Sequence, residues 1–141
     1  NSPFWYSEAA RMLPLDILPA VAACDKRGVT AIELPQTGPD IVKIDVEGCE
    51  LAVLAGMRQA ISSSLPIFII ECLSPDALRA VQDYLAEFKY SPLLIDDKNM
   101  LLLGDVQEYH WETTRNVMFY PHSKKHIIDQ IQNDSGVAIR L

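Results

Sequence analysis

The stretch Asp40-Ile41-Val42-Lys43-Ile44-Asp45-Val46-Glu47-Gly48 decides how this sequence folds. Its β-branched run over residues 41–46 predicts a buried strand, because such side chains pack well on a pleated surface. Asp45 and Glu47 close the run. Gly48 indicates a turn that needs a positive φ or a close approach of the backbone to a ligand. The sequence therefore predicts a strand whose end carries acidic side chains.

Outward from this stretch, helical and apolar extended segments alternate. Residues 50–62 place apolar side chains at helical spacing and predict a helix with one apolar face. Residues 66–71 predict a second buried strand, which ends in Glu71. Ser74 is a typical N-cap before a helix over about residues 75–88, and residues 92–95 predict a third strand. Two helical crossovers between apolar strands indicate a parallel α/β sheet.

The remaining segments are shorter or less regular. Residues 100–103 predict a hairpin strand or a separate strand, and a late hairpin next to such a sheet would be antiparallel. Residues 116–120 predict the last strand. A short helix over residues 17–26 and a short strand over 29–34 are the expectations near the start. Residues 122–141 predict a polar C-terminal tail with a short helix at 127–132. The expected architecture is α/β, the C-terminal half of a mainly parallel doubly wound sheet with a late antiparallel strand.

Composition and charge limit the possible partners. With 141 residues, 49% of them apolar, the chain has the size and make-up of one globular domain. A formal net charge of −7 disfavours binding to nucleic acids and to anionic membranes. Three cysteines without a CxxC pattern do not form a disulfide framework. We therefore expect no nucleic-acid partner, no membrane partner, and a reducing, cytoplasmic location.

Three acids follow the ends of the first two strands of this sheet. In open parallel sheets, ligands bind outside the carboxyl ends of the strands, so Asp45, Glu47 and Glu71 are candidate site residues. Asp45 could also be only a helix-capping acid, and Glu71 only the polar end of a strand. Lys43 shares a strand face with Asp45 and should pair with an acid or reach solvent. The acids could bind Mg²⁺, but nothing in the sequence demands a metal.

The run from Lys43 to Gly48, followed by Glu50-Leu51, resembles the most recognisable motif of the FkbM family of S-adenosylmethionine-dependent methyltransferases. That family's pattern is K-I-D-x-E-G, a small residue, E-L and a helix with L-x-G. A strand ending in an acid follows about twenty residues later, as residues 66–71 do here. The resemblance is close over residues 40–72. Cys49 stands where the family usually has a small residue such as alanine.

The resemblance implies a Rossmann-like methyltransferase fold in which residues 40–46 form the fourth strand. It implies S-adenosylmethionine as cofactor, with Asp45 and Gly48 as cofactor-binding residues. It also implies methyl transfer to a hydroxyl of a small molecule or sugar. Asp45, Glu47 and Glu71 are the expected catalytic acids, which could favour a sulfonium cation and act as general base.

A glycine-rich cofactor turn is missing from this sequence. The six glycines are at positions 28, 38, 48, 56, 104 and 136, so no two are closer than eight residues. We therefore expect residues 1–121 to be a partial FkbM-like domain that lacks its cofactor-loop half and is inactive alone. The alternative is a non-catalytic remnant that acts as a binding module. If the chain is a partial domain, the unpaired edge of its half-sheet should make it prone to self-association.

Overall fold

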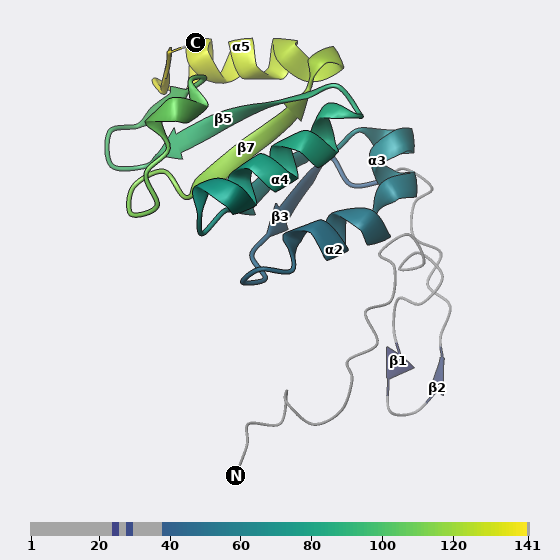
Figure 1. Ribbon diagram of the computed structural model, residues 1–141. Helices are drawn as coiled ribbons and strands as arrows, with labels where there is room; N and C mark the ends of the chain where they lie inside the picture. The colour runs from purple at the N-terminus through teal and green to yellow at the C-terminus, as the bar shows by residue number, and fades with distance from the viewer. Residues whose placement is uncertain (1–23, 26–27, 30–37, 141) are drawn as a thin grey trace.

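The computed structural model describes residues 24–25, 28–29 and 38–140 (Figure 1). Near the start, β1 (Cys24–Asp25) pairs antiparallel with β2 (Gly28–Val29). The expected helix over residues 17–26 and the strand over 29–34 lie largely outside the described residues. The main folded part of the described chain begins at Gly38.

A six-stranded sheet forms the centre of this part. In spatial order its strands are β3 (Ile41–Ile44), β4 (Ile67–Glu71), β7 (Asn116–Pro121), β5 (Tyr90–Asp96), β6 (Leu101–Leu103) and β8 (Ala138–Arg140). β3 and β4 are parallel, and β7 is antiparallel to both β4 and β5. β3, β4 and β5 therefore run in one direction, which confirms the expected parallel α/β core.

The position of the late antiparallel strand is a finding of the structure. β7 inserts between β4 and β5 instead of lying at an edge, and β6 forms an antiparallel hairpin with β5. Antiparallel pairs therefore outnumber parallel ones among the described strands, so the expectation of a mainly parallel sheet is too simple. β7 pairs with both β4 and β5, so these two strands, which run in the same direction, do not pair with each other.

Four helices accompany the sheet: α2 (Glu50–Gly56), α3 (Arg58–Ser64), α4 (Pro75–Ala86) and α5 (Lys125–Asp134). The expected single helix over residues 50–62 is interrupted at Met57, directly after Gly56, a residue of low helix propensity. Leu54, Met57 and Ile61 are all buried, as the spacing predicts. None of the described helices is long and apolar enough to cross a membrane.

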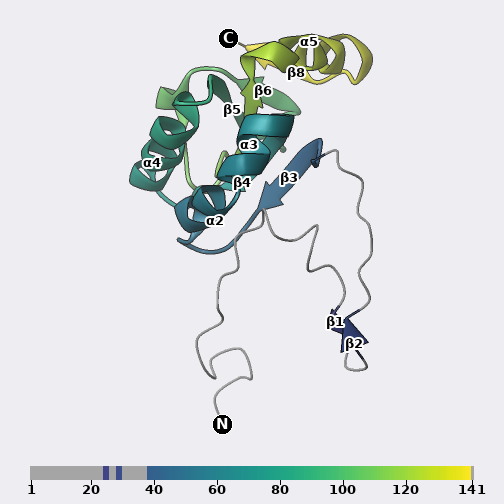
Figure 2. The same ribbon diagram turned by 90° about the vertical axis from the view of Figure 1, so that its right-hand side faces the viewer.

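Alternate side chains of the sheet belong to two separate cores. Phe68 and Ile70 pack on the side of α2, α3 and α4. Ile67 and Leu93 belong to a second cluster that includes Ile128 of α5. Figures 1 and 2 show α5 apart from the other three helices. The sheet is therefore covered on one face by α2–α4 and, over part of the other face, by α5.

Residues 122–141, expected as a polar tail, are part of this folded unit. Ile128 of α5 is 3% exposed, and Ile127 and Ile131 pack against the same cluster. β8 extends the sheet by pairing in parallel with β6. The expectation of a tail was wrong because isoleucines at i, i+1 and i+4 form an apolar stripe that the polar average of the segment conceals.

β3 is more exposed than the sequence predicts. Of its four residues only Ile44 is buried, and Ile41 is 63% exposed. Among the described strands β3 lies at the edge of the sheet, with β4 as its neighbour. A run of β-branched residues therefore does not by itself distinguish a central strand from an edge strand.

We expect the exposed end of β3 to drive self-association. Replacing Ile41 by lysine should shift the chain toward monomer in sedimentation velocity at rising concentration, because a charge on an edge strand opposes pairing with another strand. Leu51→Lys is the matched control, since Leu51 is 41% exposed but lies on helix α2. A parent chain that stays monomeric throughout, or an equal effect of both substitutions, would contradict this prediction.

Candidate functional site

Three strands bring polar side chains to the side of the sheet where the parallel strands β3 and β4 end, here called the carboxyl edge. The last parallel pair of β3 and β4 joins Ile44 to Ile70, so the next residue of each strand, Asp45 and Glu71, lies at the same edge. Glu71 is also paired with Asn116, the first residue of β7. The structure thus places two of the predicted acids at the carboxyl ends of neighbouring parallel strands, where ligands of open α/β sheets bind.

Lys43 links two of these strands. Its Nζ donates to Asn116 Oδ1 at 3.1 Å and to Asp45 Oδ2 at 3.4 Å. The Lys43 side chain is 46% exposed and the Asp45 side chain 53% exposed. The expectation that Lys43 pairs with an acid or reaches solvent is therefore confirmed on both counts. Asp45 Oδ1 accepts no hydrogen bond from the described residues, so this oxygen can face a ligand.

Glu71 is in a different environment. Its Oε1 lies 3.0 Å from Arg115 Nε, and its side chain is 15% exposed, against 48% for Arg115. A charge-assisted pair of this kind occupies one of the carboxylate oxygens. Glu71 is therefore less accessible to a substrate than Asp45, and the structural alternative considered for it gains support.

The Glu71–Arg115 pair should make a measurable contribution to stability. In a double-mutant cycle with Glu71→Gln and Arg115→Met, we expect a coupling of about 1 kcal/mol from urea denaturation, because Glu71 is largely shielded from solvent. The control is the Asp76–Arg79 pair on α4, whose side chains are 92% and 71% exposed and should show no measurable coupling. Equal couplings in the two cycles would show that the environment of Glu71 is not special.

The turn after β3 adopts an uncommon backbone conformation. Glu47 and Gly48 both have positive φ, 48° and 98°. A Cβ added at Gly48 would meet nothing within 4 Å, so the backbone conformation, not crowding, explains this glycine. The Gly48 N–H donates to Glu50 Oε1 at 2.8 Å, and Glu50 is only 5% exposed. Glu47 is exposed, and it makes no hydrogen bond with the described residues.

Cys49 and Cys72 differ in accessibility. Cys49 is exposed directly before α2, whereas Cys72 is fully buried next to Glu71. Burial raises the pKa of the Cys72 thiol to about 12, and the negative charges of Glu50 and Glu71 act in the same direction. The Tyr109 hydroxyl donates to the Cys72 carbonyl oxygen, and burial also raises the pKa of Tyr109. Neither Cys72 nor Tyr109 is therefore suited to act as an anionic nucleophile.

We expect iodoacetamide at pH 8 to modify Cys49 and to leave Cys72 untouched in the native protein. Burial raises the pKa of the Cys72 thiol far above the pH of the reaction, so very little reactive thiolate forms, and the side chain is also inaccessible. Peptide mapping by mass spectrometry measures each cysteine separately, and the same reaction in urea is the control. Similar labelling of both cysteines before unfolding would contradict the buried position of Cys72.

Sequence reasoning missed three residues of this edge: Glu50, Arg115 and Asn116. Arg115 and Asn116 stand at the start of the last strand, and an antiparallel strand begins at the edge where its parallel neighbours end. That rule could have found them once β7 was placed next to β4. Among the residues that the structure describes, no three His, Cys, Asp or Glu side chains are grouped so as to hold a metal ion.

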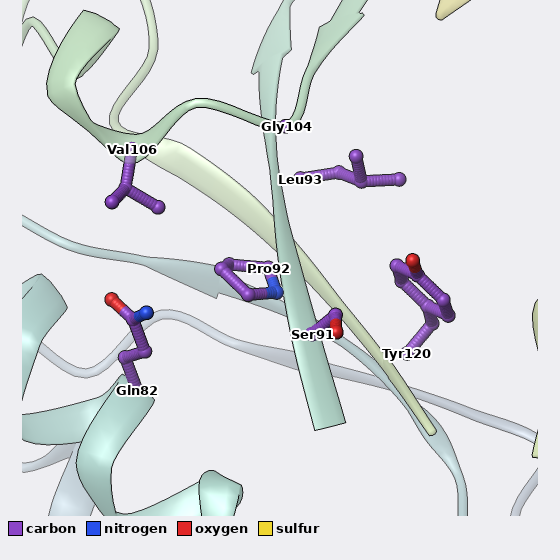
Figure 3. A pocket seen from close by; sticks show the side chains of 7 residues that line it. All are labelled: Gln82, Ser91, Pro92, Leu93, Gly104, Val106 and Tyr120. Carbon is purple, nitrogen blue, oxygen red and sulfur yellow. The ribbon is translucent and has the colours of Figure 1, made fainter. Parts of the chain in front are cut away.

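A shallow hollow lies elsewhere on the molecule. Figure 3 shows its lining around the first half of β5: Gln82, Ser91, Pro92, Leu93, Gly104, Val106 and Tyr120. β5 runs toward Asp96, so this hollow is not at the carboxyl edge. It contains none of the acids described above, and it is not the candidate site.

Comparison with known families agrees with the motif at this edge. Residues 29–92 match the family model of the Methyltransferase FkbM domain. The matched segment contains β3, β4 and the turn with Asp45, Glu47 and Gly48. Comparisons with curated proteins and with solved structures give no match. The family predicted from the sequence motif is thereby confirmed for this segment.

Proposed function

Because residues 29–92 carry an FkbM methyltransferase domain, we propose that this chain is the C-terminal part of an S-adenosylmethionine-dependent O-methyltransferase. The proposed acceptor is a hydroxyl group of a small molecule or sugar. The observation that carries the proposal is the Asp45 carboxylate, which is 53% exposed at the carboxyl edge of the sheet with one oxygen available. An accessible carboxylate at this position can take the proton of a hydroxyl.

The residues of this edge fit the charge of the proposed cofactor. When bound, S-adenosylmethionine supplies an activated methyl group on a sulfonium cation. Asp45 and Glu47 are exposed acids, and their negative charges would favour a cation beside them. Asp45 and Gly48 are the proposed cofactor-binding residues. Since the sequence contains no glycine-rich turn, these residues would hold only the cationic part of the cofactor.

The proposed mechanism assigns a separate task to each acid. Asp45 removes the proton of the acceptor hydroxyl, and the proton moves to Oδ1. Glu47 adds a second negative charge in the turn beside Asp45. Glu71 is held by Arg115, so it contributes a fixed carboxylate that orients the acceptor and does not take up a proton. Holding the two reactants in one orientation supplies much of the rate.

A non-catalytic binding module is the second candidate, and the absence of closely spaced glycines favours it. The test uses the protein as its natural gene encodes it. Transfer of a labelled methyl group to hydroxyl-bearing sugars and small molecules supports the enzyme. Absence of both methyl transfer and S-adenosylhomocysteine binding in calorimetry would instead favour the remnant.

We also propose a cytoplasmic location. The support is the cysteine chemistry: Cys49 and Cys72 are free thiols, as expected in a reducing compartment. A fusion to a redox-insensitive fluorescent protein, followed by cell fractionation, tests this location independently of activity.

A further inference from the structure

Lys43 places a positive charge at an edge where a cationic cofactor is proposed to bind. Its ammonium group lies 3.4 Å from the nearer oxygen of Asp45, the proposed base. A lysine that served only to fill a strand position would extend into solvent. Here the tip of the side chain contacts Asp45, the residue directly after β3, and Asn116, the first residue of β7.

The two cations of this edge have different partners. Arg115 forms a 3.0 Å ion pair with Glu71, in which the two charges offset one another. Lys43 makes its shorter contact with Asn116, a neutral amide, at 3.1 Å. An amide oxygen orients an ammonium group but does not neutralise it. The charge of Lys43 is therefore held in place by Asn116 and by an exposed, 3.4 Å ion pair with Asp45.

An ammonium group has three N–H donors, and the described residues accept from two of them. The Lys43 side chain is 46% exposed, so the third donor can reach a bound molecule. A group that binds next to Asp45 would then meet a proton acceptor and a cationic hydrogen-bond donor together. This combination suits a hydroxyl oxygen that loses its proton and develops negative charge.

We propose that Lys43 is a further catalytic residue, whose ammonium group donates to the acceptor oxygen and stabilises the negative charge that develops on it. The inference rests on the proposed methyltransferase function. Asp45 takes the proton as the O–H bond breaks. The acceptor oxygen forms its bond to the methyl carbon as that carbon's bond to the donor sulfur breaks, and the bonding pair stays on sulfur.

This role predicts effects of opposite sign on catalysis and on binding. Without the Lys43 charge, the acceptor oxygen loses its stabilising partner, so turnover falls. The same cation repels a sulfonium cation that binds near Asp45, so its removal favours the cationic cofactor. The thioether product is neutral and should be much less affected. A purely structural lysine would weaken the binding of both molecules in parallel.

The experiment compares Lys43→Met and Lys43→Arg with the parent, using the protein as its natural gene encodes it. Methyl transfer gives turnover, and calorimetry gives the Kd of S-adenosylmethionine and of S-adenosylhomocysteine. Lys43→Met should lower turnover by about 10²–10³-fold. It should also lower the Kd of S-adenosylmethionine several-fold relative to the Kd of S-adenosylhomocysteine. Lys43→Arg should retain both the charge and most of the activity. Lys125→Met is the control, because Lys125 is also half-exposed and paired with an acid, Asp129.

Two results would overturn the inference. One is turnover of Lys43→Met at the parent rate. The other is a parallel loss of affinity for both ligands together with a lower Tm, which would make Lys43 a structural residue. If the parent itself transfers no methyl group and binds neither ligand, the proposed function fails and this inference with it. An active parent with a fully active Lys43→Met variant contradicts the inference alone.

Discussion

Replacing Asp45 by asparagine should lower the rate of methyl transfer by about 10²–10⁴-fold, the usual loss when a catalytic proton acceptor is removed. The shape of the side chain is nearly unchanged, and an amide oxygen can still accept a hydrogen bond from Lys43. What is lost is the capacity to take up a proton and one negative charge. Because the side chain is 53% exposed, the Tm should change little.

The measurement is turnover with labelled donor and Tm on the same samples, with Glu71→Gln as the comparison. Glu71 is 15% exposed and paired with Arg115, so its substitution should cost more stability than Asp45→Asn and less activity. Asp45→Asn should therefore lose mainly activity, whereas Glu71→Gln should lose mainly stability. If Asp45→Asn turns over at the parent rate while its Tm falls, Asp45 is a structural partner of Lys43, and the proposed base must be sought elsewhere.

The elements of this fold were largely predictable, because their signals are local. The N-cap at Ser74 is one example: its side chain accepts from the Ala77 N–H, as the sequence predicts. The spacing of Leu54, Met57 and Ile61 predicted a buried helix face equally well. Such features depend on residues within one or two turns. They need no knowledge of the rest of the chain.

The arrangement of the sheet was not predictable in the same way. No local pattern states that β7 lies between β4 and β5, because that order depends on pairings between residues about fifty positions apart, such as Phe68 with Phe119. The exposure of β3 follows from its place at the edge of the described sheet. It could not be derived from Ile41 or Val42 themselves.

Part of the candidate site was predictable from the sequence, and part was not. Asp45 and Glu71 were found because the carboxyl ends of parallel strands share an edge, a rule that needs only the order of elements along the chain. Arg115 and Asn116 were not predicted, because they lie near Glu71 only when β7 inserts between β4 and β5. Their contacts change the roles of the acids: Glu71 becomes half of an ion pair, and Asp45 keeps an available oxygen.

The largest loss of stability should come from the centre of the sheet. Phe68 is fully buried in β4, between Val42 of β3 and Phe119 of β7. Its ring lies 5.8 Å from that of Tyr90, whose hydroxyl donates to the Pro66 carbonyl oxygen at 2.8 Å. Phe68→Ala would leave a cavity that touches three strands. Such large-to-small changes typically cost about 3–5 kcal/mol.

Urea denaturation measures this effect, and Phe88→Ala is the matched control. Phe88 is also a phenylalanine in the same core, but it is only partly buried, against Tyr84 and under Arg58. Its removal should cost about 1 kcal/mol, since solvent already reaches the ring. A loss of 3–5 kcal/mol is a large part of the roughly 5–15 kcal/mol that stabilises a domain, so Phe68→Ala should be partly unfolded at 37 °C. If the two alanine variants were equally stable, β4 would not be the packed centre of this sheet, and the edge that carries Asp45 and Glu71 would lack the rigid support that the proposed chemistry requires.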